Sequence, residues 1–267
     1  MSIYTALSGA VAAEKKIDLI ANNLANVNTN GFKRDSLTFK EYLTELEKEA
    51  IPEASIRSSY KWEDYHNLRG FDKSFVDIDT VETDYSQGSI VNTGRNLDLA
   101  INGAGFFAIS TPMGIAFTRN GAFSLDSQGR LVTKEGFPVL TGTGDFINED
   151  GFEEIFIRGN IHFDKEGGIY QDGEKLYDLL TYNFTDKRAL AKQGGNLYLN
   201  TDPIINETFA FQNNIISGAL EGSNVNPLKE MVDLISANRA FESYQNVIKS
   251  FDEINSKAID GVGRLIG

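Results

Sequence analysis

The 267-residue chain contains no cysteine, which excludes disulfides, thiolate metal sites and cysteine nucleophiles. It has only two histidines, His66 and His162, and they lack the HxxxH or HExxH spacing of a metal site. GxSxG and GxxxxGK motifs are also missing. We therefore expect no enzyme, cofactor or metal site. A carbohydrate-active β domain with paired carboxylates is the enzyme alternative, although no pair stands out in the sequence.

The chain also lacks long apolar runs and an excess of basic residues. No run approaches the roughly 20 apolar residues of a membrane span, so we expect no membrane insertion. No basic region precedes the first apolar segment, and Glu14, Lys15 and Lys16 interrupt it, so we expect no cleaved secretory signal. The net charge of -13 excludes nucleic acid as a partner, because no basic patch replaces the counterions, and it favours solubility.

Apolar residues recur near both ends at alternating steps of three and four. The first series is Ile3, Ala6, Ala10, Ala13, Ile17, Ile20, Leu24 and Val27. The second is Leu234, Ala237, Phe241, Tyr244, Ile248, Phe251, Asn255, Ala258, Val262 and Leu265, in which only Asn255 is polar. This 3.5-residue repeat predicts that the two ends form a left-handed coiled coil, with these residues as its seam. Two amphipathic helices lying on a globular core are the alternative.

Both helices have boundary signals. Asn226 followed by Pro227 is typical of an N-cap and a first-turn proline, so the second helix should begin there. The stretch NNLANVNTNGF (22–32) is rich in asparagine, which leaves helices readily. We expect the first helix to fray across this cluster and to end at Asn30-Gly31, with Gly31 in the left-handed region.

The middle of the chain has β-strand signals. Short β-rich runs, with NG or DG at 102, 120, 150 and 172, indicate a domain of hairpins. The runs are LDLAI (97–101), GFFAIS (105–110), IAFTRN (115–120), AFSLD (122–126), RLVT (130–133) and FPVL (137–140). We therefore predict an α+β, multi-domain chain. Residues 1–32 with 228–267 form the coiled-coil stem, 33–79 an extended linker, and 80–227 the β-rich domain.

Three blocks of sequence resemble one known family. SGA followed by ANNLANVNTNGFKRDSLTF (21–39) resembles the N-terminal signature of the flagellar rod and hook axial proteins. LDLAINGAGFFAI (97–109), with FTRNGAFSLDSQGRLVTKEGFPVL (117–140), resembles their β domain, and GALEGSNVNPLKEMVDLISANRAFE (218–242) resembles the rod-protein C-terminal signature. The blocks lie in the family's order and include both ends, so together they are specific.

The resemblance implies a structural subunit of the flagellar basal-body rod. Such subunits leave the cell through the flagellar type III export apparatus without a cleaved signal. Their terminal helices become ordered on assembly with copies of the same chain and other rod subunits, forming a tube around the export channel. The length indicates a rod rather than a hook protein. The stretches SIYTALSGA and GALEGSNVNP look closer to the proximal rod type, and the distal rod type is the alternative.

The expected assembly interface combines the asparagine cluster with most of the seam. Its residues are Ile3, Ala10, Ile17, Ile20, Asn22, Asn23, Leu24, Asn26, Val27, Asn28, Asn30, Leu234, Phe241, Tyr244, Ile248, Phe251, Asn255, Val262 and Leu265. We expect the asparagines to bond backbone groups of neighbouring subunits; simple helix termination is the alternative. A non-flagellar β binding module on a closed coiled-coil stalk is the second functional hypothesis.

Overall fold

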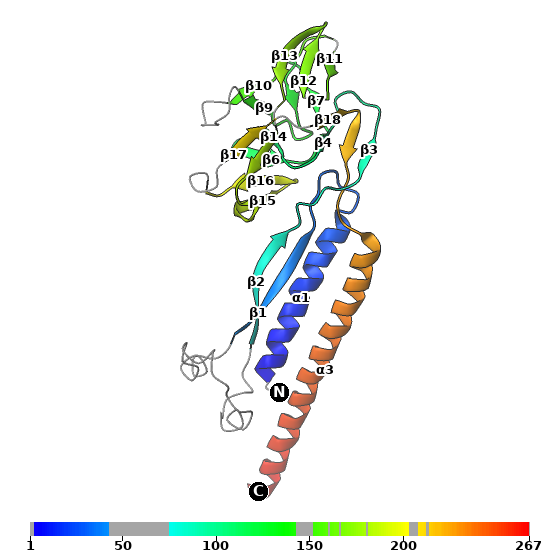
Figure 1. Ribbon diagram of the computed structural model, residues 1–267. Helices are drawn as coiled ribbons and strands as arrows, with labels where there is room; N and C mark the ends of the chain where they lie inside the picture. The colour runs from blue at the N-terminus through cyan, green and yellow to red at the C-terminus, as the bar shows by residue number, and fades with distance from the viewer. Residues whose placement is uncertain are drawn as a thin grey trace, which may run out of the picture. The chain divides into compact units, whose positions relative to one another are not determined.

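The computed structural model describes residues 3–42, 75–142, 152–159, 161–165, 167–179, 181–202, 208–211 and 214–266. Within these residues the chain is mostly β with two α-helices, which confirms the predicted α+β class (Figure 1). It divides into two compact units. Unit 1 contains residues 1–24, 35–82 and 227–267, and unit 2 contains 25–34 and 83–226. No helix in the described part of the chain is both long and apolar enough to cross a lipid bilayer.

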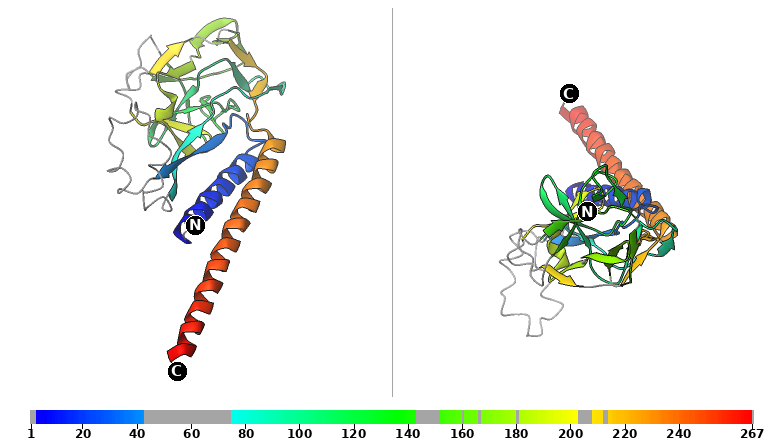
Figure 2. Two further views of the ribbon diagram at one scale, coloured as in Figure 1. Left: turned by 60° about the horizontal axis from the view of Figure 1, so that its bottom comes forward. Right: turned by 90° about the horizontal axis from the view of Figure 1, so that it is seen from above.

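The described residues of unit 1 form two α-helices and a pair of strands. Its elements are α1 (Ile3–Ala25), β1 (Asp35–Tyr42), β2 (Phe75–Thr83) and α3 (Pro227–Ile266). The views agree that α1 lies between the β1–β2 pair and α3 (Figures 1 and 2). The Ser36 hydroxyl donates to the Glu82 carbonyl, and the Thr38 hydroxyl donates to the Thr80 carbonyl. Residue numbers rise along β1 as they fall along β2, so the two strands are antiparallel. Both strands begin within the segment expected to be a linker.

The boundary predictions for the helices had different outcomes. Helix α3 begins at Pro227, as the Asn-Pro signal predicted. The predicted end of the first helix was wrong, because α1 ends at Ala25 and turns follow it. Gly31 does have a positive φ of 69°. Its N–H donates to the Glu221 carbonyl (2.8 Å), so residues 25–34 follow the β-rich unit and not the helix.

A six-stranded antiparallel sheet is the largest sheet of unit 2, with the order β10-β9-β5-β6-β16-β15. Its strands are β5 (Phe107–Thr111), β6 (Gly114–Thr118), β9 (Val139–Gly142), β10 (Phe152–Glu154), β15 (Leu190–Gly194) and β16 (Leu197–Asn200). Alternate residues of β5 face opposite sides. Phe107 and Ile109 enter one apolar core, while Ala108 joins Tyr182 and Tyr198 in a second core.

Smaller sheets complete unit 2. Three strands form the sheet β11 (Ile161–Phe163), β12 (Gly168–Gln171) and β13 (Glu174–Asp178). The paired strands are β14 (Thr181–Phe184) with β17 (Thr208–Phe211), β18 (Asn214–Ser217) with β4 (Leu99–Asn102), β19 (Ala219–Glu221) with β3 (Ile90–Asn92), and β7 (Ser124–Leu125) with β8 (Leu131–Val132). A short 3-10 helix, η4 (Lys187–Ala189), precedes β15.

The predicted strand runs between 97 and 140 are confirmed, since β4 to β9 lie within or overlap them. The DG signal at 172 is also confirmed as a hairpin turn. Asp172 and Gly173 both have positive φ (51° and 93°) between the antiparallel strands β12 and β13, as a type I′ turn requires. The DG at 150 lies outside the described residues.

Candidate assembly interface

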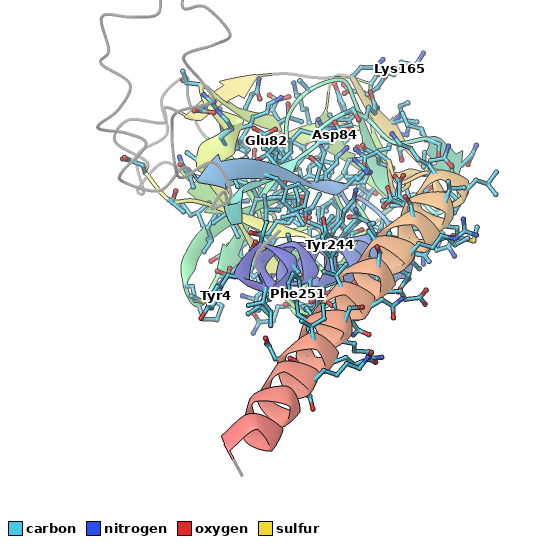
Figure 3. The ribbon with its side chains drawn as sticks, turned by 90° about the horizontal axis from the view of Figure 1, so that it is seen from below. Tyr4, Glu82, Asp84, Lys165, Tyr244 and Phe251 are labelled. Carbon is cyan, nitrogen blue, oxygen red and sulfur yellow. The ribbon has the colours of Figure 1, made fainter. Side chains whose placement is uncertain are left out.

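The helices α1 and α3 pack closely and in opposite directions. A Cβ atom added at Gly9 would lie 2.6 Å from the Tyr244 ring, so the α1 backbone touches that ring. Near the other end of α1, the Asn23 side chain reaches Glu230. The interval from Gly9 to Asn23 equals the interval between their partners, Tyr244 and Glu230. In this antiparallel register, residue n of α1 therefore lies level with residue 253 − n of α3. Tyr244 and Phe251 project from α3 on the side where α1 lies (Figure 3).

Small residues make this close approach possible. The buried residues of α1 are Ala6, Gly9, Ala10, Ala12, Ala13, Ile20 and Asn23. Ala6 is completely buried, and on α3 Ala237 is 4% exposed. These small residues leave room for the Tyr244 ring to lie against the backbone of α1 at Gly9. The helix pair should therefore tolerate larger side chains at these positions poorly.

Asn23 fastens the end of α1 inside unit 1. Its side chain is fully buried. The Asp35 N–H donates to Asn23 Oδ1 (3.0 Å), and Asn23 Nδ2 donates to the Asp35 carbonyl (2.9 Å) and to Glu230 Oε2 (3.4 Å). These bonds lie within one chain, in contrast to the intersubunit bonds that we expected for this asparagine. Asn23 thus joins α1, the start of β1 and the first turn of α3.

Asn23→Ala should loosen unit 1 and leave unit 2 folded. The variant leaves buried polar groups of Asp35 and Glu230 without this amide partner, at a cost of about 2–3 kcal/mol. Hydrogen exchange of the α1 amides should accelerate accordingly, while β5 and β6 stay protected, and swimming should be lost. The exposed neighbour offers a matched control for folding, since Asn22→Ala should leave the exchange of the α1 amides unchanged. Normal swimming of the Asn23→Ala strain would contradict this role.

The predicted seam residues lie mostly on the buried side of the two helices. Ala10 and Ile20 are buried. The half-buried ones are Ile3, Ile17, Leu24, Leu234, Phe241, Tyr244, Ile248 and Phe251. Asn255 is exposed, and the side chains of Val262 and Leu265 lie outside the described residues. The structure places the described part of the seam on these two helices within one chain; the coiled coil itself stays a prediction.

The remaining predicted asparagines lie around the end of α1. Asn22 and Asn28 are exposed, while Asn26, Asn30 and neighbouring Val27 are half-buried. The Thr29 hydroxyl lies 3.1 Å from Asn26 Oδ1, and Asn196 Nδ2 donates to the Asn30 carbonyl (2.9 Å). Part of this cluster therefore shapes the turn that follows α1. An intersubunit role for the exposed members stays a prediction.

A buried charge network that the sequence did not reveal holds this turn in unit 2. Glu221 Oε1 accepts from Lys33 Nζ (2.6 Å) and from the Gly88 N–H (2.9 Å), and Oε2 accepts from Arg119 Nη1 (3.1 Å). Lys33 and Glu221 side chains are fully buried, and Arg119 is 2% exposed. Burial lowers the pKa of Lys33, and the Glu221 carboxylate opposes that shift. Glu221 thus compensates two buried cations.

Two exposed apolar stripes on the helices were also not predicted from the sequence. On α1 the stripe is Tyr4, Leu7 and Val11, which are 66%, 52% and 47% exposed. On α3 it is Leu228, Met231, Val232 and Ile235. The spacing of three and four residues within each stripe is visible in the sequence. It marks a second face of each helix, beside the face that carries the seam. Contiguous exposed apolar surface of this kind marks sites of protein association.

Family models match three parts of the chain. They are "Flagella basal body rod protein" at residues 3–33, "Flagellar hook protein FlgE/F/G D1 domain" at 100–174, and "Flagellar basal body rod FlgEFG protein C-terminal" at 216–260. The chain is 34% identical to flagellar basal-body rod protein FlgG of Bacillus subtilis, across 97% of this chain and 98% of that protein. It is 32% identical to flagellar basal-body rod protein FlgF of Caulobacter vibrioides, across 99% and 98%. The chain therefore belongs to the flagellar basal-body rod protein family, whose members are structural proteins of the bacterial flagellum's basal body.

Proposed function

We propose that this rod subunit polymerises helically through its terminal helices, forming the drive shaft and its central export channel. The observation that carries the proposal is the exposed apolar surface on both α1 and α3. A helix pair that serves only as a stalk has no use for such surface away from its mutual contact. When heterologous contacts between copies do not close into a ring, they generate a helical assembly.

The charge distribution supports a division of the chain into an inner and an outer part. Residues 228–267 contain five basic and six acidic residues, and residues 1–32 contain two of each, so the helices are nearly neutral. Residues 80–227 contain ten basic and nineteen acidic residues, which gives this part a net charge of -9. Nearly neutral helices can pack densely in a tube, whereas the acidic part repels its copies and favours an outer position. We assign 1–32 with 228–267 to the tube, 33–79 to a linking region and 80–227 to the outer domain.

We infer a proximal position in the rod, because SIYTALSGA and GALEGSNVNP look closer to the proximal type. A distal position is the alternative, and relatives named FlgF and FlgG both match nearly the whole chain. The partners are copies of the chain and other rod subunits. The flagellar type III export apparatus would deliver the chain, without a cleaved signal peptide.

Self-association of the purified full-length chain tests the function. Analytical centrifugation at rising concentration should give open polymers of increasing size. A β binding module on a closed stalk would instead give one defined oligomer, such as a trimer, and that result would overturn the proposal.

Ile248→Asp should prevent this polymerisation. Ile248 is half-buried on the seam side of α3, so the variant would desolvate a carboxylate between the helices. We expect the concentration needed for polymers to rise at least about tenfold, a change of roughly 1.4 kcal/mol. The adjacent exposed residue supplies the control, because Lys249→Asp should polymerise nearly as the wild type does. Rods built from the Ile248→Asp chain would rule out the seam as an assembly element.

A further inference from the structure

The exposed stripe of α1 faces away from the buried side of that helix. Leu7 and the buried Gly9 are two residues apart, which corresponds to about 200° around a helix. Tyr4, Leu7 and Val11 therefore point away from the contact with Tyr244. The exposed carboxylate of Glu14 continues this stripe by one further step of three.

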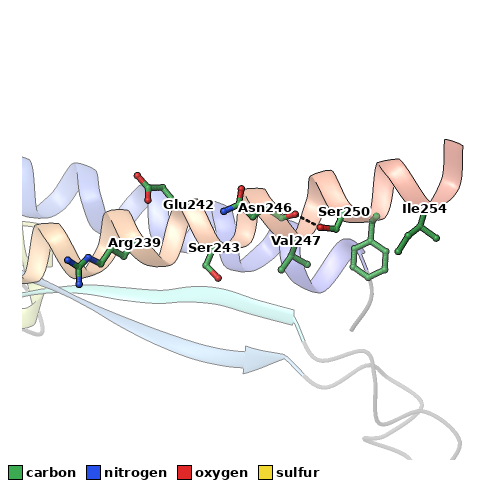
Figure 4. A pocket seen from close by; sticks show the side chains of 8 residues that line it. Arg239, Glu242, Ser243, Asn246, Val247, Ser250 and Ile254 are labelled. Atoms are coloured by element: carbon green, nitrogen blue, oxygen red, sulfur yellow. Dashed lines mark hydrogen bonds between the residues drawn. The ribbon is translucent and has the colours of Figure 1, made fainter. Parts of the chain in front are cut away.

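A hollow runs along the flank of α3, from the α1-facing side, where Phe251 lies, to the opposite side, where Asn246 lies (Figure 4). Its lining residues are Arg239, Glu242, Ser243, Asn246, Val247, Ser250, Phe251 and Ile254. The two serines are small and expose the helix surface, while Ile254 is 62% exposed and adds apolar surface. Asn246 is two residues from the α1-facing Tyr244, so it also points about 200° away from it.

The stripe and the hollow lie at the same height along the helix pair. The register set by Gly9 with Tyr244 and Asn23 with Glu230 places Leu7 level with Asn246. By the same register Val11 is level with Glu242, and Glu14 is level with Arg239. A copy displaced sideways and rotated about the helix axis, with little shift along that axis, would bring the apolar stripe to the hollow and the carboxylate to the guanidinium.

We propose that the α1 stripe of one copy docks in the α3 hollow of a second copy of this chain, with Glu14 paired to Arg239. The inference rests on the proposed function, because it names the surfaces through which the rod subunit polymerises. Tyr4, Leu7 and Val11 supply apolar knobs, the serine-lined hollow receives them, and the charges at Glu14 and Arg239 are complementary. Each copy offers one stripe on α1 and one hollow on α3, so a third copy can always add to the second.

Engineered cysteines test the contact directly, because the chain has none of its own. The variant Leu7→Cys/Asn246→Cys should give a ladder of dimers, trimers and larger species on mild oxidation. The two positions point away from each other within one chain, so a disulfide, which needs Cβ atoms about 4 Å apart, must join two copies. Mixing the two single-cysteine chains should stop the ladder at a mixed dimer.

The control pair is Leu7→Cys/Gln245→Cys. Gln245 is exposed at nearly the same height but lies about 100° away around α3. This pair should cross-link much less than the Asn246 pair. Equal cross-linking of the two pairs, or none in either under conditions where the chain polymerises, would overturn the docking proposal.

A charge exchange supplies the second measurement. Glu14→Arg and Arg239→Glu should each raise the concentration needed for polymers about tenfold, through like-charge contact. The double exchange should return it to within about threefold of the wild type. Both residues are exposed, so folding is unaffected. If both single variants polymerise at the same concentration as the wild type, the docking alone is refuted. If the wild-type chain never polymerises, the proposed function is refuted.

Discussion

Glu221→Ala is expected to destabilise unit 2 by about 3–5 kcal/mol, because removing one member of a buried ion network leaves uncompensated charge behind. Lys33 Nζ and Arg119 Nη1 both contact this carboxylate, and all three side chains are almost completely buried. The Gly88 N–H would lose its acceptor as well. The variant would therefore leave two cations and one backbone donor buried together.

Hydrogen exchange of the β4 and β5 amides under rising denaturant measures this loss. Those strands lie in the apolar cores of unit 2, so their exchange reports its global opening. The exposed pair between Arg188 and Asp186 supplies the control, since Arg188 is 82% exposed and Arg188→Ala should leave the exchange nearly unchanged. Equal protection of β4 and β5 in Glu221→Ala and wild type would show that the network does not hold unit 2 together.

Gly9→Leu should separate α1 from α3 and abolish rod assembly. Even a Cβ at this position would lie 2.6 Å from two ring atoms of Tyr244, and no real Cβ contact is that short. A leucine must therefore push the helices apart or displace the ring, and such overpacking costs about 1–3 kcal/mol or more. The cost falls on unit 1, so unit 2 should remain folded and soluble.

Exchange of the α1 amides should accelerate about tenfold to a hundredfold in Gly9→Leu, in line with that cost. Swimming should be lost. The exposed Ala21 gives the matched control, because Ala21→Leu adds the same volume towards solvent. Gly9→Leu/Tyr244→Ala should recover part of the protection, because the smaller residue leaves room for the leucine. Full swimming of Gly9→Leu alone would contradict the close helix contact.

Local signals in the sequence were enough to predict the two α-helices and the strands β4 to β9. Pro227 has a fixed φ and lacks an N–H, so it marks the start of α3 wherever the helix packs. Asp172-Gly173 tolerates positive φ at both positions and so predicts the hairpin between β12 and β13. The apolar repeat predicted which side of α1 would be buried. A 3.5-residue repeat identifies the apolar face of a helix even when the element that packs against that face is unknown.

Three of the features that the sequence did not reveal depend on partners that are distant along the chain. Helix α1 stops at Ala25 because the residues after it bond to unit 2, including Glu221, and no local signal carries that information. Lys33 is a charged residue that is normally exposed, and its burial depends on an acid 188 residues away. Asn23 was expected to face another subunit because its partner Glu230 is equally remote in sequence.

Because α1 and α3 are distant along the chain, they can pair only in a polypeptide that has been synthesised as far as α3. The contact between Asn23 and Glu230 spans 207 residues, and Gly9 finds its partner Tyr244 only in the final helix. A polypeptide that breaks off before α3 can still complete unit 2, but its first helix has nothing to pack against. Truncated products would therefore lack the paired helices from which we propose that the tube is built. Selection of this kind needs no separate factor, because α3 (Pro227–Ile266) is itself the helix against which α1 (Ile3–Ala25) packs.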